Sequence, residues 1–297
     1  MRRISLSFFS LFFFSFSQTS SATLLQEIKD KLKLSPTGKQ LLELSEKKLK
    51  ASGRQWKDLV FIEGYESKLE TVLIRRFPKD RPWEISYRVE QKIYLSSEGN
   101  LYNRIRDLSH ELAHFVYQEQ ENFFVGEIKI LDFIQKTIEQ EGGEAHAYEK
   151  ECLVVKELYP DVASQDYSCQ KFLAASHKKR FEMFYALGAY WGHFWDHPLI
   201  RSLESSLVKK RLSYLSDTKI DFYSQVHQLP YPLGALKELD KILVAIKKSE
   251  ERRQKILSAS QKSLSPTPKG VGIEENKSVD ELRHERNSKN NEENKLL

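Results

Sequence analysis

The feature that most constrains this chain is the segment His110–His114, which reads His-Glu-Leu-Ala-His within a run of helical periodicity. Histidines four residues apart project from the same side of a helix, one turn apart. Apolar residues recur on another face of the same helix, in the stripe Leu101, Ile105, Leu108, Leu112 and Phe115. The segment therefore predicts a helix that buries one face in a core and holds two imidazoles together on another.

Two imidazoles one turn apart can bind a single Zn²⁺ ion. Glu111, between them, would point toward the space beside the metal, where it can take a proton from a metal-bound water and pass it to a leaving amine. The alternative is an amphipathic helix whose histidines only line a polar groove. Strands before the helix and a candidate third ligand after it favour the metal site.

A catalytic zinc ion needs a third protein ligand and one open coordination position. No third histidine follows at the short spacing of metzincins, and both cysteines lie downstream, which excludes a peptide-deformylase-like site. Glu144 is the preferred ligand, because it opens a helix after two glycines and small neighbours allow close approach to the histidine helix. Glu141, His146 and Glu149 remain alternatives. Tyr148, one turn after Glu144, is a candidate hydrogen-bond donor to its carboxylate or to a polarised carbonyl.

The order of a strand, this histidine helix and a glutamate-bearing helix resembles the zincin fold of zinc metallopeptidases, specifically the gluzincin group, over residues 85–159. The resemblance implies three zinc ligands and one general base, namely His110, His114 and Glu144 as ligands and Glu111 as the base. It also implies that the strand near Gln91–Ser96 is the edge strand along which an extended peptide would lie.

The rest of the sequence predicts an α+β, mainly α, zincin-like domain over residues 23–250, with a small sheet on the N-terminal side of the histidine helix. Strands are predicted at 59–63, 71–77 and between 85 and 95, and helices at 24–34, 39–50, 101–115, 128–141, 144–159, 178–195 and 235–257. Residues 251–297 contain no Phe, Tyr, Trp or Cys and predict a charged, disordered tail, into which the long helix runs a few residues.

Residues 1–22 predict a secretory signal peptide. Arg2 and Arg3 precede the uncharged run Ile4–Ser17, which carries six phenylalanines, and the small residues Ser20-Ser21-Ala22 follow at a cleavage position. An uncleaved N-terminal anchor is the alternative, although the run is short for a transmembrane helix. We therefore expect a secreted or periplasmic protein, with a signal of bacterial style and no stable membrane span after cleavage.

Cys152 and Cys169 are the only cysteines of the chain. An even number of cysteines in an exported protein favours a disulfide between them, with two buried free thiols as the alternative.

The compact group at residues 192–198, rich in His, Asp and Trp, is interpreted as a helix end with ordinary polar caps rather than as a substrate wall.

A net charge of +5 over 297 residues, with acids interspersed among the basic clusters, gives no reason to expect nucleic-acid binding. We expect an exported, monomeric zinc metallopeptidase that acts on peptide or protein substrates through Glu111. Two alternative functions fit the same residues. One is an envelope or extracellular interaction protein on a zincin-like scaffold, with a structural metal or none, and the other is a zinc amidase acting on cell-wall material.

Overall fold

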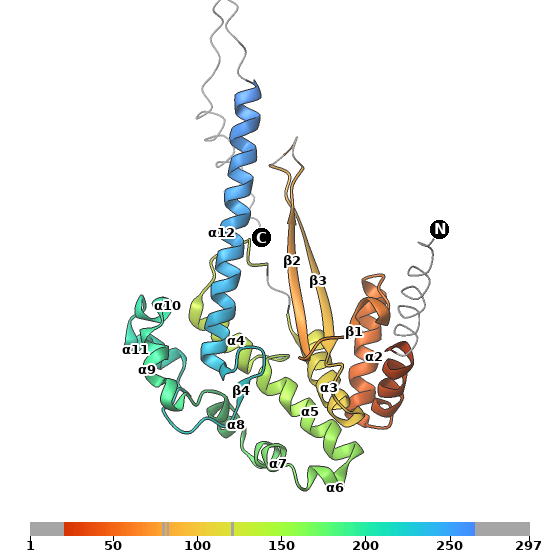
Figure 1. Ribbon diagram of the computed structural model, residues 1–297. Helices are drawn as coiled ribbons and strands as arrows, with labels where there is room; N and C mark the ends of the chain where they lie inside the picture. Colours follow the sequence, from red (N-terminus) through yellow and green to blue (C-terminus); the bar gives the residue numbers. More distant parts are fainter. Residues whose placement is uncertain (1–20, 79–80, 82, 120–121, 265–297) are drawn as a thin grey trace, which may run out of the picture. The chain divides into compact units, whose positions relative to one another are not determined.

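The computed structural model describes residues 21–78, 81, 83–119 and 122–264, so residues 1–20 of the predicted signal peptide and 265–297 of the predicted tail lie outside the described residues. The chain divides after Arg253 into two compact units. The protein is mainly helical with a small sheet, as the sequence predicts (Figure 1). The site described below belongs to the first unit.

The main sheet has three strands in the order β1–β3–β2, formed by β1 (Val60–Ile62), β2 (Lys68–Arg76) and β3 (Ser86–Leu95). β2 and β3 form a long antiparallel hairpin, while β1 pairs in parallel with the C-terminal end of β3, at residues 93–95. Because β3 is the central strand, the prediction that residues 91–96 form the edge strand is wrong. β2 is an edge strand of this sheet. Alternating apolar residues identify a strand and its buried face, but they do not specify its neighbours.

The histidine helix is α3 (Leu101–Tyr117), and it packs against β3, α2 (Pro36–Ala51) and α5 (Glu144–Leu158). Its N-cap is Asn100, whose side chain accepts a hydrogen bond from the Asn103 N–H. The predicted apolar stripe is fully buried at Ile105, Leu108, Leu112 and Phe115. The stripe therefore anchors α3 in the first core, which the sheet, α2 and residues 21–32 complete.

The remaining elements are short apart from the last helix. They are η1 (Trp56–Asp58), α4 (Ile130–Glu139), α6 (Pro160–Ala163), α7 (Tyr167–Ala174), α8 (His177–Phe184), η2 (Gly188–Tyr190), α9 (Trp191–Asp196), α10 (Pro198–Arg201), α11 (Ser205–Arg211), β4 (Tyr223–Ser224), β5 (Leu229–Pro230) and α12 (Tyr231–Leu264). Many of these helices, from α4 onward, share a second, strongly aromatic core.

The single helix predicted over residues 178–195 is wrong, because α8 ends at Phe184 and α9 begins at Trp191. Between them, the Leu187 N–H donates to Ser216 O and the Gly188 N–H donates to Thr218 O. In a continuous helix, these two N–H groups would instead donate to carbonyl groups of the same helix, one turn earlier. A distant segment therefore interrupts the helix, and local apolar spacing does not reveal such a partner.

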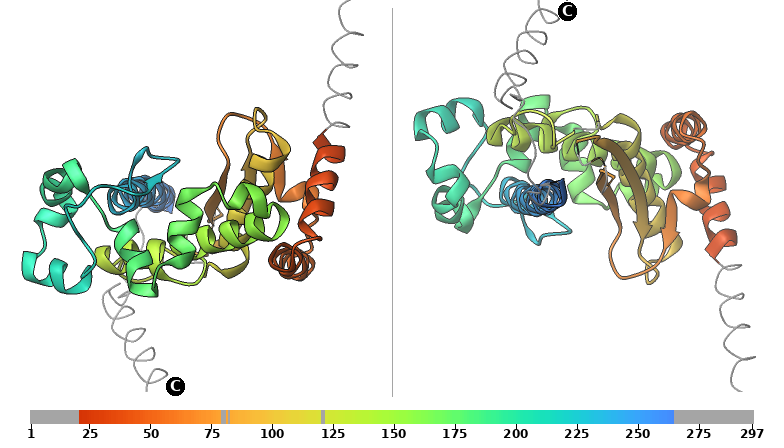
Figure 2. Two further views of the ribbon diagram at one scale, coloured as in Figure 1. Left: turned by 90° about the horizontal axis from the view of Figure 1, so that it is seen from below. Right: turned by 90° about the horizontal axis from the view of Figure 1, so that it is seen from above.

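The long helix α12 begins at Tyr231 and ends at Leu264, so it extends beyond the predicted 235–257 at both ends. Pro232 lies in its first turn, where a missing backbone N–H costs no hydrogen bond. Figure 2 looks along this helix. Arg75 of β2 pairs with Glu250 of α12 at 2.9 Å, which places the hairpin beside this part of the helix. Within the described residues, no helix is long and apolar enough to cross a membrane.

The predicted disulfide is confirmed. Cys152 on α5 is bonded to Cys169 on α7, with the two Cα atoms 5.3 Å apart. Both residues are buried. The bond therefore ties α5, the helix that carries Glu144, to α7.

Candidate metal centre

Three of the predicted site residues lie together where α3 meets the start of α5. The Nε2 atoms of His110 and His114 are 3.1 Å apart. Glu144 Oε2 lies 3.5 Å from His110 Nε2 and 3.7 Å from His114 Nε2. The three ligand atoms lie within 4.8 Å of one another, so the group could hold a metal ion.

Gly142 allows the two helices to approach this closely. Its φ is +79°, and a Cβ at this position would lie 2.3 Å from Gln118 N at the end of α3. Any other residue would therefore push the start of α5 away from α3. At this approach, the Gly142 carbonyl accepts a hydrogen bond from His114 Nδ1 at 2.7 Å.

A second acceptor fixes the other imidazole. His110 Nδ1 donates to Glu151 Oε2 at 3.1 Å. Because each Nδ1 is held by an acceptor, both Nε2 atoms face Glu144. Outer hydrogen bonds of this kind orient metal-binding histidines in proteins and fix their tautomer. The donor set and its orientation thus fit a bound transition metal.

The charges of the cluster also favour a cation. Burial lowers the pKa of His114, against the opposing effect of Glu144. Burial also lowers the pKa of His110, but hydrogen bonds to Glu144 and Glu151 outweigh this effect and raise it well above its usual value. Burial raises the pKa of Glu144, yet His114 and His110 bring it below the usual range. A proton held at His110 would be displaced when a metal ion binds.

Glu111 lies beside this group and has a distinct environment. Its side chain is buried, with 8% of the residue exposed. Burial raises the pKa of its carboxyl to about 7, against the opposing effect of His110. The backbone of Leu69 on β2 lies near the carboxyl and also opposes the rise in its pKa. The predicted base is therefore held against the edge strand of the sheet, with a pKa suited to proton transfer near neutral pH.

The alternatives to Glu144 do not join the cluster. Glu141 is exposed at the end of the loop before α5. His146 Nδ1 accepts a hydrogen bond from the Gly142 N–H at 3.0 Å, and its ring packs against Tyr117. Glu149 pairs with Arg180. The structure thus brings Glu144, and none of these three, to the histidines.

The tyrosine beside Glu144 is not the predicted one. The ring of Tyr148 packs against Phe172, Phe184 and Phe222 in the second core. The hydroxyl that helps to lower the pKa of Glu144 belongs to Tyr231, in the first turn of α12. Burial raises the pKa of Tyr231 well above its usual value, so the phenol stays protonated and can donate.

Sequence reasoning missed Glu151 and Tyr231 for different reasons. Glu151 lies seven residues after Glu144, two helical turns along the same face, so helical spacing could have indicated it. Tyr231 belongs to a segment far from the motif, next to two prolines that predict only a break. The spacing around the histidines contains no information about it.

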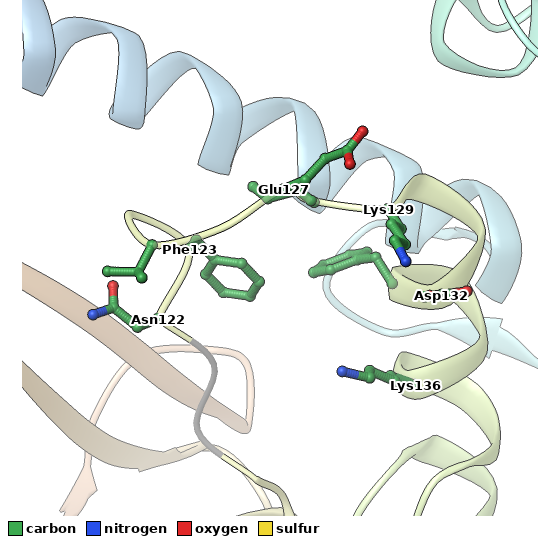
Figure 3. A pocket seen from close by; sticks show the side chains of 9 residues that line it. Asn122, Phe123, Glu127, Lys129, Asp132 and Lys136 are labelled. Carbon is green, nitrogen blue, oxygen red and sulfur yellow. The ribbon is translucent and has the colours of Figure 1, made fainter. Parts of the chain in front are cut away.

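Two other regions lie outside the centre. His197 accepts from the Leu199 N–H as the N-cap of α10 and lies 3.2 Å from Asp240, which agrees with its interpretation as a polar cap. A cavity of about 370 Å³ lies between α4 and the loop before it, and Phe123 of the loop and Lys136 of α4 both line it (Figure 3). The ring of Phe123 lies 5.9 Å from that of Phe133, between centroids, at an angle of 60°. None of the residues lining this cavity belongs to the metal-binding group.

Comparisons of the chain with protein families, curated proteins and solved structures found no match. The chemistry of the site is therefore argued from its own residues. Two imidazole nitrogens and one carboxylate oxygen form a ligand set that zinc accepts in sites that keep an open coordination position.

Proposed function

We propose that this protein is an exported zinc metallopeptidase of the zincin type, with His110, His114 and Glu144 as zinc ligands. The observation that carries the proposal is the convergence of two Nε2 atoms and one carboxylate oxygen within 4.8 Å, next to a second, buried carboxylate, that of Glu111. A structural zinc site is closed by four protein ligands, whereas three ligands leave a position for water or substrate. A zinc ion held there would act as a Lewis acid toward a carbonyl oxygen and toward water.

Glu111 is the general base of the proposed reaction. Its carboxylate takes a proton from the attacking water and passes it to the amine that leaves. The backbone of Leu69 lies beside this carboxylate, and burial brings the pKa of Glu111 to about 7 in the metal-free protein. A zinc ion beside the carboxyl would favour its ionised form, the form that accepts the proton.

The substrate is an extended peptide lying along the outer edge of β2. An edge strand presents unpaired N–H and C=O groups, which can pair with an added strand. Glu70, Thr71 and Val72 are the exposed part of this strand, one residue beyond the contact of Leu69 with Glu111. A peptide paired there would pass directly beside the base.

Tyr231 is the donor that stabilises negative charge on the substrate carbonyl. Its phenol is buried beside Glu144, and Glu111 is close enough to raise its pKa further. A neutral hydroxyl fixed in a buried site stabilises an oxyanion without reorganisation at the moment of reaction.

The test is Glu111→Gln in the zinc-loaded protein, assayed on unfolded protein substrates by mass spectrometry of the new N-termini. We expect unchanged zinc content and a loss of hydrolysis of roughly 10²–10⁴-fold. Glu141→Gln, an exposed acid of the preceding loop, is the matched control and should retain full activity. Full proteolysis by Glu111→Gln would refute the proposal.

The same assay separates the other two functions. Release of fragments from cell-wall material, with no cleavage of peptides by the wild type, indicates the zinc amidase. Stoichiometric zinc without hydrolysis of either material indicates the interaction protein with a structural metal.

A further inference from the structure

Behind the histidines, a cationic side chain joins the carboxylate that orients His110. Arg106 Nε donates to Glu151 Oε1 at 2.8 Å, and its Nη2 donates to the same oxygen. The other oxygen of Glu151 accepts from His110 Nδ1. Arg106 lies one turn before His110 on α3, so this contact also fastens α3 to α5.

An aspartate holds the far side of the guanidinium. Asp166 Oδ2 lies 3.6 Å from Arg106 Nη1, and its Oδ1 accepts from the Cys169 N–H at the start of α7. Cys169 is bonded to Cys152, the residue after Glu151. Glu151, Arg106, Asp166 and the disulfide thus form a closed circuit of contacts and bonds, which we call the Arg106 brace.

We propose that Arg106 is a positioning residue of the metal centre, which holds Glu151 so that His110 presents Nε2 to a transition-metal cation. The proposal rests on the metal centre of the proposed function, but not on peptide hydrolysis. Loss of an outer hydrogen-bond partner of a metal-binding histidine typically weakens metal binding about 10–100-fold. The planar fork of arginine fixes a carboxylate in a way that the single ammonium of lysine does not.

Whether metal affinity falls or rises when Arg106 is removed distinguishes a positioning role from a purely electrostatic one. The guanidinium of Arg106 is positive, so its field opposes the binding of a second cation beside His110. If Arg106 acted through its charge alone, removing it would tighten metal binding. If it positions Glu151, removing it weakens metal binding in spite of the lost repulsion.

The experiment measures the dissociation constant for Zn²⁺ alone, by competition with a chromophoric chelator, and the visible spectrum of the Co²⁺-loaded protein. Arg106→Met and Arg106→Lys are compared with the wild type. Arg104→Met is the matched control, because Arg104 lies on the same helix and donates to the carbonyls of Ser96 and Ser97 instead.

We expect Arg106→Met to raise the dissociation constant by about tenfold or more, and Arg106→Lys by less, with an altered Co²⁺ spectrum in both. Arg104→Met should bind like the wild type. If Arg106→Met does not fold, the zinc dissociation constants of Arg106→Lys and Asp166→Asn test the proposal instead. Asparagine at position 166 retains the N-cap of α7 and removes the negative charge beside the guanidinium. Weaker binding by both supports the brace, and unchanged binding by both overturns it.

Unchanged or tighter zinc binding by folded Arg106→Met overturns this proposal and leaves the proposed function intact. Absence of zinc binding by the wild type overturns both. Zinc binding that weakens equally in Arg104→Met and Arg106→Met also overturns it, because the effect would then belong to the helix and not to the brace.

Discussion

Two turns of α5 present carboxylates to the same histidine, but in different charge environments. Glu144, in the first turn, faces two imidazoles and the phenol of Tyr231, none of which carries a permanent charge. Glu151, two turns later, is paired with the guanidinium of Arg106. A buried carboxylate needs a compensating charge. In the metal-free protein a proton at His110 compensates Glu144, whereas the guanidinium of Arg106 compensates Glu151. A metal ion can displace the proton but not the guanidinium, so the comparison favours Glu144 as the metal ligand and Glu151 as the group that holds His110.

The largest effect should come from removing the carboxylate of the first turn. We expect Glu144→Ala to weaken zinc binding about a thousandfold, on the order of 4 kcal/mol, because one of three ligands is lost. Zinc content after dialysis, measured by atomic spectroscopy, checks this. Glu141→Ala is the control and should keep about one zinc per chain. Retention of zinc by Glu144→Ala would place the third ligand elsewhere.

The next largest effect is on stability and concerns the turn of α5 that carries Glu151, which the disulfide ties to α7. Replacing both Cys152 and Cys169 by serine should lower the free energy of unfolding by about 3 kcal/mol, as expected for closing a loop of this length. Urea denaturation of the zinc-free protein measures this change. We expect the double variant still to bind zinc, because Glu144 and both histidines are untouched. A change within about 0.5 kcal/mol would show that the helices hold α7 without the bond.

The third prediction concerns Tyr231, the tyrosine beside Glu144, and its role in the proposed reaction. Tyr231→Phe should lower kcat about a hundredfold with little change in KM, because it removes a donor to charge that develops only during the reaction. Zinc content should stay at one per chain. Tyr148→Phe is the control, since that ring packs in the aromatic core. A rise in KM with unchanged kcat would instead assign Tyr231 to substrate binding.

Features that follow from helical spacing were predictable, and so were two tertiary contacts, of Glu144 with the histidines and of Cys152 with Cys169. The other tertiary contacts of the site were not predictable. Helical spacing identified the buried stripe of α3 and the convergence of His110 with His114, because both follow from the helix itself. Glu144 followed from small residues that permit close packing. The central position of β3, the break between α8 and α9, and the approach of Tyr231 depend on partners distant in sequence. No local periodicity encodes such partners.

The smallest effect concerns Glu111 and has a defined pH dependence. Its pKa rises from 4.5 to about 7 in the folded, metal-free protein, mainly because of burial. The folded state therefore holds this proton more tightly than the unfolded state, and the stabilisation present below pH 4.5 is lost as the pH rises toward 7. Glutamine at this position does not titrate. The stability advantage of Glu111→Gln over the wild type should thus grow between pH 4.5 and 7 and then level off.

We expect the difference between the two proteins to be about 2.5 kcal/mol larger at pH 8 than at pH 5, given 1.36 kcal/mol for each unit of pKa change. Urea denaturation at pH 5 and pH 8, with a chelator present, measures it, and exposed Glu141→Gln should show no such trend. Added zinc should shrink the difference at pH 8, because a nearby cation favours the ionised Glu111. A difference that is independent of pH would mean that Glu111 is ionised throughout this range. Its pKa would then not be raised, and Glu111 would resemble the ionised, paired Glu151 instead of a buried group that holds a proton.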